Sequence, residues 1–428
     1  MPQDNYALAE PFDSGVVKLI EELRAYAHEH PAATSATLAL EGILDRLIDQ
    51  ALRSGTAADG DLPAISSLEQ LATIFPDSPK PWLYLSKLSV DRGDHQRGLQ
   101  CAESGLQVEP SHPGLTFNRA LCLLHMDNSQ AAIDEFRRYI ELEPGNPWAY
   151  NNIGDAYRRM KVYDLAENYL QLAIEHDRKF APAHRNLALL YLDQRAWRQC
   201  IYHAQAAARL GPFDNELHLT LGDAHMGLGD PRNALSHLIW ATLVDKGFVE
   251  AYETMSAAYA DLRMFELSRA AAREALRLNP QSWMAQANIG YSYSKEGLFN
   301  EAVEPLLEAL ERGPDEEGEY KILWQLGWAY LWLGENGKAL EYTELAVQRK
   351  EYPDLILLFN RGLVLAAQGN WETSDHAYAA AETRARAMDK PSVILEAIAD
   401  AKELISKKGL KVKSGSRLAW LLEGMLES

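Results

Sequence analysis

The chain has 428 residues, of which 47% are hydrophobic and 24% charged, so it is not an intrinsically disordered polar chain. Its formal net charge of −19 repels phosphate backbones and argues against nucleic acid as a main partner. Only Cys101, Cys122 and Cys200 are cysteines, which excludes a disulfide scaffold and fits a reducing compartment.

The start of the chain shows no export signal. Residues Met1 to Asn5 include no basic region followed by an apolar run, so they do not read as a signal peptide. Nowhere does the sequence approach 18 consecutive uncharged apolar residues, the length that a membrane-spanning helix needs. We therefore expect a cytoplasmic protein that makes no membrane contact.

The first 78 residues predict three helices. Val16, Ile20 and Leu23 fall on one stripe of an amphipathic helix from Ser14 to His28. Residues 35–53 and 64–76 predict two more helices, joined by a glycine-containing loop at 54–61. We interpret residues 1–78 as a terminal helix followed by a degenerate copy of the repeat that comes next.

Residues 79–388 repeat with a period of 34, counting three extra residues at 317–319 and one more before the last unit. The nine units begin at residues 79, 113, 147, 181, 215, 249, 283, 320 and 355. Position 8 of each unit is small: Ser86, Ala120, Gly154, Ala188, Gly222, Ser256, Gly290, Gly327 and Gly362. Position 20 is also small in all nine units, and position 27 in eight of them.

This spacing predicts two helices per unit. Positions 4, 7, 8 and 11 are mostly apolar at helical spacing, and positions 20, 24 and 27 form a second such stripe. Small residues at positions 8 and 20 would let the two helix axes approach closely. Breaks between the helices are expected at Gly93, Gly229, Gly297 and Gly334. Position 32 is proline in five units, which favours ending the second helix there.

The last segment, residues 389–428, predicts two helices outside the repeat. Pro391 opens one that runs to about Lys408, and a second spans Arg417 to Glu427 with an apolar stripe. Repeat arrays need caps at their ends, so we expect both helices to cap the array. The alternative is that the final helix, through residue 428, docks onto a partner.

The pattern resembles the tetratricopeptide repeat (TPR) family over nine consecutive units. The resemblance implies an all-α, right-handed α-solenoid of helix-turn-helix TPR units that binds proteins in a concave groove. Two departures are Arg119 and Arg361 at position 7, which is usually apolar in the family. Four more replace the proline of position 32: Arg178, Lys246, Glu351 and Arg386.

No catalytic or cofactor-binding pattern is present in the sequence. Phosphate-binding loops, dinucleotide fingerprints, zinc-protease helices and paired C-x-x-C cysteines are all absent. His184 and His218 share position 4, and His203 and His237 share position 23, but no cysteine or carboxylate completes a metal site. We expect no enzyme activity, no metal and no cofactor.

Position 6 of the unit lies roughly opposite the core stripe of the first helix. The side chains there are Tyr84, Asn118, Asn152, Asn186, Thr220, Thr254, Asn288, Gln325 and Asn360. Asparagine fills five of nine places although the chain has only 16 asparagines. Amides can pair with both the C=O and the N–H of an extended peptide, so the row predicts a peptide-binding ladder. It is similar to the asparagine ladder of O-GlcNAc transferase TPR superhelices, whose catalytic domain has no counterpart here; the alternative is that these amides serve water or local bonds.

Two patches on the same face are further candidates for peptide binding. Arg158, Arg159 and Arg185 form a basic patch beside Asn151 and Asp155, and arginine forks suit carboxylates. The alternative is a solvated charge cluster with intramolecular partners.

The second patch is aromatic. Trp324, Trp328 and Trp332 follow one another at intervals of four residues, with Tyr291 in the preceding unit. Grouped tryptophans in a groove are typical binding anchors, although a stripe at helical spacing is more often buried.

We therefore predict a non-enzymatic adaptor or scaffold that binds an extended protein segment in its concave groove. The alternatives are a chaperone or regulatory subunit of a dedicated enzyme or secretion partner that acts through another surface, and a self-assembling scaffold that forms a homo-oligomer.

Overall fold

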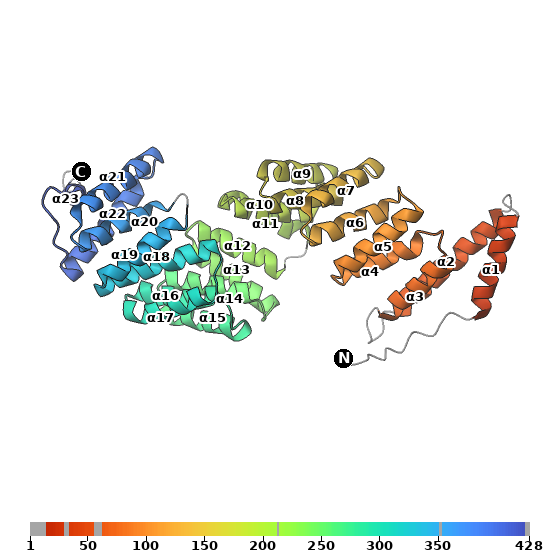
Figure 1. Cartoon of the computed structure of the whole chain (residues 1–428), viewed down its shortest axis with the longest axis horizontal. Helices are drawn as coiled ribbons and strands as arrows, with labels where there is room; N and C mark the ends of the chain where they lie inside the picture. The colour runs from red at the N-terminus through yellow and green to blue at the C-terminus, as the bar shows by residue number, and fades with distance from the viewer. Residues whose placement is uncertain (1–13, 30–33, 55–61, 212–213, 351–352, 424–428) are drawn as a thin grey trace. The chain divides into compact units, whose positions relative to one another are not determined.

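The structure, a computed structural model, describes residues 14–29, 34–54, 62–211, 214–350 and 353–423, and every regular element in them is an α-helix (Figure 1). Three helices precede the repeat: α1 (Ser14–Glu29), α2 (Thr34–Ser54) and α3 (Leu62–Ile74). The expected loop at 54–61 lies largely outside the described residues.

Nine helix pairs follow, one for each predicted unit. They are α4 (Lys80–Asp91) with α5 (His95–Val108), α6 (Pro113–His125) with α7 (Ser129–Leu142), α8 (Pro147–Arg159) with α9 (Tyr163–His176), α10 (Ala181–Asp193) with α11 (Trp197–Leu210), α12 (Asn215–Gly227) with α13 (Pro231–Val244), α14 (Val249–Asp261) with α15 (Phe265–Leu278), α16 (Trp283–Glu296) with α17 (Phe299–Glu311), α18 (Glu316–Leu333) with α19 (Asn336–Gln348), and α20 (Leu355–Ala367) with α21 (Trp371–Ala387). The predicted all-α solenoid of helix-turn-helix units is confirmed. The three inserted residues at 317–319 extend α18 at its N-terminal end.

Two helices close the described chain, α22 (Pro391–Lys408) and α23 (Arg417–Glu423). Arg417 begins α23 and forms an ion pair with Glu382 of α21, a carboxylate that is almost fully buried. The backbone N–H of Arg417 also donates to Asp375. These bonds hold α23 on α21, the last helix of the array; a capping role stays a prediction. Residues 424–427 of the predicted helix lie outside the described residues.

The contacts divide the chain into two compact bodies. The N-terminal body comprises residues 1–194 and 202–212, and the C-terminal body comprises residues 195–201 and 213–428. This division falls within the array, whereas the predicted boundaries at residues 78 and 388 follow the ends of the repeat. Those boundaries stay a prediction about sequence organisation, and each body is described by itself below.

The two helices of a unit approach closely because position 8 is small. A Cβ atom added at Gly154 would lie 2.6 Å from Cγ of Leu170, and one at Gly290 would lie 2.6 Å from Cγ of Leu306. Leu170 and Leu306 both hold position 24 and are fully buried. The leucine of the second helix therefore fills the space that the small residue of the first helix leaves.

Chain reversal between the helices requires a left-handed backbone. Gly93, Gly229, Gly297 and Gly334, the four expected breaks, have φ between 73° and 88°. Four other units place Asp127, Lys161, Arg195 or Arg263 in the same conformation, with φ from 57° to 60°. Glycine adopts this region without a Cβ penalty. The non-glycine residues adopt it as well, so the turn keeps the same backbone conformation with different residue types.

The first helices of successive units touch one another directly. Such contacts join α4 to α6, α6 to α8 and α8 to α10 in the N-terminal body, and α12 to α14, α14 to α16, α16 to α18 and α18 to α20 in the C-terminal body. Among the described residues, second helices of successive units share no comparable contact. The first helices therefore line the inner face of each body, a term we use for the side on which they meet.

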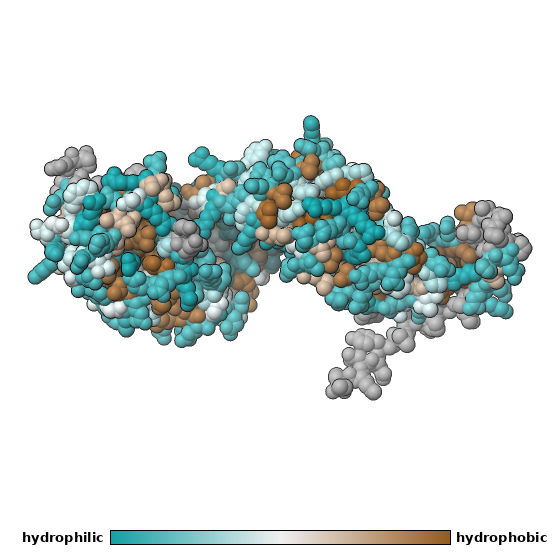
Figure 2. Space-filling model, turned by 45° about the horizontal axis from the view of Figure 1, so that its top comes forward, coloured by the Kyte–Doolittle hydropathy of each residue, from teal (hydrophilic) through white to brown (hydrophobic). Residues whose placement is uncertain are grey.

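The surface of the protein carries the polar faces of its amphipathic helices. In the view of Figure 2 most surface residues are hydrophilic, and apolar residues show as short, interrupted strips between them.

The two arginines at position 7 are accommodated by ion pairs. Arg119 pairs with Glu135, and Nε of Arg361 lies 2.7 Å from Oε1 of Glu344. A charge at this normally apolar position is thus neutralised locally.

The close approach at position 8 predicts opposite effects for two glycine-to-alanine substitutions. Gly154→Ala adds a methyl group that meets Leu170, so we expect it to lower the free energy of unfolding by about 1–2 kcal/mol, as overpacking does. Gly42→Ala, in α2, meets no atom within 4 Å and should stabilise by about 0.5–1 kcal/mol through helix propensity. Urea titration followed by circular dichroism measures both. Equal midpoints for the two variants would contradict the packing account.

Candidate functional site

Three amide side chains form a directed row on the inner face of the N-terminal body. Nδ2 of Asn186 on α10 donates to Oδ1 of Asn151 on α8 at 2.9 Å. Nδ2 of Asn151 in turn donates to Oδ1 of Asn152 at 3.2 Å. Asn151 is 3% exposed and Asn152 is 9% exposed. The bonds run in one direction and polarise each other, and they end at the amide of Asn152.

Other position-6 side chains also bond to the preceding unit. Nδ2 of Asn118 donates to Oγ of Ser86 at 2.8 Å, and Nδ2 of Asn288 donates to the carbonyl of Glu253 at 2.8 Å. Oγ1 of Thr254 bonds to Oδ1 of Asp223 at 3.1 Å. Since each partner lies about one unit earlier in the chain, these side chains join adjacent first helices.

Several of the position-6 amides have hydrogen-bond partners within the chain. Asn118, Asn186 and Asn288 each use at least one donor within the chain, because position 6 faces the neighbouring first helix as well as solvent. Asn360 is buried, and Oε1 of Gln325 is buried with no hydrogen-bond partner among the described residues. Contact of these side chains with a peptide stays a prediction.

The basic patch is a network of ion pairs. Arg158 contacts Oδ1 of Asp155 at 2.9 Å and Oδ2 of Asp193, on α10, at 2.8 Å. Nε of Arg159 lies 2.9 Å from Oδ2 of Asp155, and Arg159 stays more exposed than Arg158. Arg185 lies half-buried on α10. The sequence interpretation missed Asp193. Arg158 holds position 12 of its unit and Asp193 holds position 13 of the next unit, so the repeat numbering was a usable signal.

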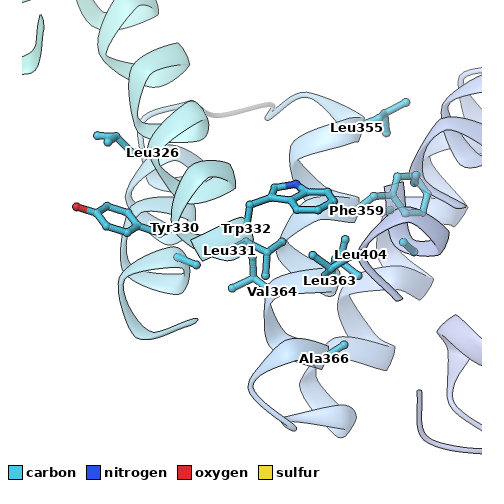
Figure 3. Close-up of a cluster of buried hydrophobic side chains, with 14 of the residues drawn as sticks. Leu326, Tyr330, Leu331, Trp332, Leu355, Phe359, Leu363, Val364, Ala366 and Leu404 are labelled. Atoms are coloured by element: carbon cyan, nitrogen blue, oxygen red, sulfur yellow. The ribbon is translucent and has the colours of Figure 1, made fainter. Parts of the chain in front are cut away.

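The expected aromatic anchors lie in different surroundings. Trp332 is only 5% exposed; its ring stacks on Phe299 at 5.2 Å, and Trp328 meets it edge-on at 6.0 Å. Nζ of Lys407, at the end of α22, lies 5.9 Å from the centre of the Trp332 ring. An exposed anchor at Trp332 is therefore wrong, because its ring is buried in an apolar cluster that also contains Leu404 of α22 (Figure 3).

Trp324 keeps part of its surface. It lies half-buried beside Tyr320 and lines an open pocket of about 590 Å³. Apolar, basic and acidic side chains share the pocket walls, among them Ile356, Met388, Lys350 and Asp354. Lys350 is already paired there, with Glu317 at 3.2 Å and Asp354 at 3.7 Å.

Tyr291, the fourth aromatic candidate, is already engaged. Its hydroxyl donates to Oδ1 of Asp261 at 2.7 Å, and Nζ of Lys295 lies 5.2 Å from its ring centre. Burial together with the Asp261 carboxylate raises the pKa of Tyr291 far above its usual range, so the phenol stays protonated.

The histidines of positions 4 and 23 form a pair within each of two units, between the first and the second helix. Nδ1 of His184 lies 3.0 Å from Nδ1 of His203, and the equivalent atoms of His218 and His237 are 3.3 Å apart. Burial, with a smaller contribution from the neighbouring histidine, lowers the pKa of His203 and of His237 to about 4. Over the described part of the chain, no group of three or more His, Cys, Asp or Glu side chains is placed to hold a metal ion.

The histidine pairs predict acid sensitivity. Histidine in an unfolded chain titrates near 6.5, so between pH 6.5 and 4 the unfolded state binds more protons than the folded state. Stability contributed by the neutral pairs is present above pH 6.5 and is lost as the pH falls towards 4. We expect His203→Gln with His237→Gln to reduce the loss of urea stability between pH 7 and pH 5.

The matched control for this pair is His376→Gln, at an exposed position of α21. It should keep the pH dependence of the parent chain. A histidine-pair variant that loses as much stability at pH 5 as the parent would contradict the assignment.

Among the described helices, none has an apolar stretch long enough to cross a lipid bilayer.

The fold and the inner face define a helical-repeat protein of the solenoid class. Three tetratricopeptide repeat models match the chain, at residues 85–152, 149–180 and 254–317. The chain therefore contains tetratricopeptide repeats at these residues.

Two curated relatives and one solved structure share this architecture. The anaphase-promoting complex subunit cut9 of Schizosaccharomyces pombe is 25% identical over 156 residues, which are 35% of this chain and 23% of the relative. The BBSome complex member BBS4 of Bos taurus is 19% identical over 222 residues, 52% of this chain and 43% of the relative. The matched region thus spans less than half the length of either relative.

A hetero-tetramer of Cut9 with Hcn1 gives the structural comparison. It matches 82% of this chain and 73% of its own chain with a TM-score of 0.51 at 16% identity, which shows a shared fold.

Proposed function

We propose that this chain is a non-enzymatic scaffold that binds an extended segment of a protein partner along the inner face of its N-terminal body. The observation that carries the proposal is the amide row Asn186–Asn151–Asn152 across two first helices that touch. TPR proteins commonly mediate protein–protein contacts, and the related Cut9 assembles with Hcn1.

The arrangement favours a ligand with polar backbone and acidic side chains. The row ends at the amide of Asn152, and the partly exposed Arg159 lies about two helical turns further along α8. A peptide carbonyl would meet the amide, and a carboxylate would meet the arginine fork. Arg158 contacts both Asp155 and Asp193, whereas Arg159 contacts Asp155 and keeps more of its surface exposed, so we assign the ligand carboxylate to Arg159, with Arg185 on α10 as the second arginine of the patch.

A peptide array of extended acidic and neutral sequences, followed by fluorescence polarisation on the best binders, tests the assignment. Arg159→Gln together with Arg185→Gln should weaken binding of acidic peptides about 10-fold or more, the loss of one or two hydrogen bonds to a charged group. Arg232→Gln, an exposed arginine on the outer helix α13, is the matched control and should change nothing.

Circular dichroism verifies that each variant remains folded. Unchanged affinity in the double variant, or an equal loss in Arg232→Gln, would contradict binding at this face.

A second candidate function rests on the outer helix α13. Position 29 of the repeat is polar or charged in eight units: Gln107, Glu141, Glu175, Arg209, Arg277, Glu311, Gln348 and Thr383. In the unit that contains α13 it is Leu243, which is 61% exposed beside Trp240 at 58% and Val244 at 56%. An apolar group at a position that is otherwise polar favours contact through an outer surface, including self-assembly.

Self-assembly through α13 predicts a mass that rises with concentration. Light scattering at two concentrations measures the mass, and Trp240→Ser with Leu243→Ser should return the chain to a monomer. Trp148→Ser, at a tryptophan of similar exposure on α8, should not. A monomer at both concentrations would rule out self-assembly through α13.

A further inference from the structure

The last residues of three first helices hold the same place in the repeat of the N-terminal body. His125 ends α6, Arg159 ends α8 and Asp193 ends α10, and all three are at position 13 of their units. These helices touch in that order, α6 with α8 and α8 with α10. The charge of Arg159 acts on His125, so a histidine stands beside the arginine to which we assign the ligand carboxylate.

Arg159 also reaches the turn that follows α6. Its Nη1 lies 3.7 Å from Oδ1 of Asp127, whose side chain is 91% exposed, and its Nε lies 2.9 Å from Oδ2 of Asp155. A long ion pair with an exposed carboxylate contributes little to stability, because water competes for both charges. A ligand carboxylate can therefore replace Asp127 beside this guanidinium, at the end of α6.

The imidazole of His125 is held by stacking. Its ring lies parallel to that of His95, the first residue of α5, with 4.5 Å between centroids and 8° between planes. Nδ1 of His95 is buried with no hydrogen-bond partner among the described residues, whereas His125 is exposed. His125 is thus the ring of the pair that a ligand can reach.

The charged groups that act on His125 come from neighbouring helices. They are His95 of α5, and Arg159 and Asp155 of α8. Burial, followed by His95 and Arg159, lowers the pKa of His125 below its usual value of 6.5, and Asp155 acts in the opposite direction. The imidazole is therefore neutral at pH 7 in the chain without a ligand.

Two further helices, α4 and α7, also pack against α6. Asp91 holds position 13 at the end of α4, and α7 begins with the uncharged Ser129 and Gln130. Arg159 is thus the permanent cation that acts on His125, and a carboxylate bound to Arg159 would remove the repulsion that keeps the imidazole neutral.

We propose that His125 is a further ligand-binding residue of the inner face of the N-terminal body, where one carboxylate of the bound segment bridges the His125 imidazolium and the Arg159 guanidinium. Binding then transfers a proton from solvent to the imidazole, because the adjacent carboxylate favours its charged form. This inference rests on the proposed function, since it needs an acidic ligand at Arg159.

Proton uptake makes the affinity depend on pH. The ligand carboxylate raises the pKa of His125 in the complex, while the aspartates and glutamates of the ligand, with ordinary pKa values near 4, stay ionised above pH 6. Between pH 8 and pH 6 the complex binds more protons than the free chain, so the affinity rises as the pH falls. A gain of about threefold to tenfold corresponds to a shift of roughly one pKa unit at this single histidine.

Isothermal titration calorimetry of the full chain tests the coupling. The probe is the acidic peptide that binds best on the array, titrated at pH 8 and pH 6 in buffers of different ionisation enthalpy, which counts the protons taken up. The parent chain should gain affinity about threefold to tenfold at pH 6, with proton uptake. His125→Gln should match the parent at pH 8, keep that affinity at pH 6 and take up no proton.

Two more variants separate charge from structure. His125→Lys carries its charge at both pH values, so it should bind at pH 8 about as tightly as the parent does at pH 6. His28→Gln, at an exposed position in the last turn of α1, is the matched control and should behave as the parent. A merely structural role of His125 would lower the affinity of His125→Gln at both pH values, and His125→Lys would not restore it.

The outcomes distinguish this inference from the proposed function. If the peptide binds at pH 8 but the parent gains nothing at pH 6, or His125→Gln gains as much as the parent, the role of His125 is overturned and acidic-peptide binding stands. If no acidic peptide on the array binds the parent chain at either pH, both proposals fail.

Discussion

The array depends on how closely two helices can approach at position 8 of each unit. Where Gly154 or Gly290 stands, the leucine of position 24 fills the space that any side chain would need. This contact fixes the angle within a unit, and the repetition of one angle stacks first helices on first helices. An inner face of continuous first helices follows from that packing, and any ligand of the inner face meets side chains that also hold the stack together.

The amides of position 6 show this double duty. Asn118, Asn186 and Asn288 bond across the contact between units, so they contribute to the order of the array as well as to the polarity of its inner face. Buried polar groups are costly when unpaired, and these bonds pair part of the row. The same need gives the ion pairs of Arg158 with Asp155 and Asp193 a structural role.

The features that repeat with the 34-residue period could be predicted from the sequence. The nine helix pairs and the glycine turns follow from spacing, because small and apolar residues repeat with the geometry of the unit. Partners in the neighbouring unit were harder to foresee: Asp193 and Ser86 lie about 33 residues from Arg158 and Asn118, and no helical wheel relates them.

For Trp332 the sequence left two alternatives open, an exposed anchor and a buried stripe. Its position in the repeat faces away from the core of its own unit, which led to the expectation of an exposed anchor. Its ring stacks on Phe299 and belongs to one apolar cluster with Leu404 of α22, a helix outside the repeat. Part of the surroundings of Trp332 therefore comes from a helix that the period does not contain.

The central claim, that position-6 amides join adjacent units, is most directly tested by NMR of side-chain amide groups in protein labelled with ¹⁵N-asparagine. The account predicts slow solvent exchange for the side-chain NH₂ resonances of Asn118, Asn186 and Asn288, assigned by single substitution. Exchange as fast as that of asparagine in an unfolded peptide at all three positions would contradict it.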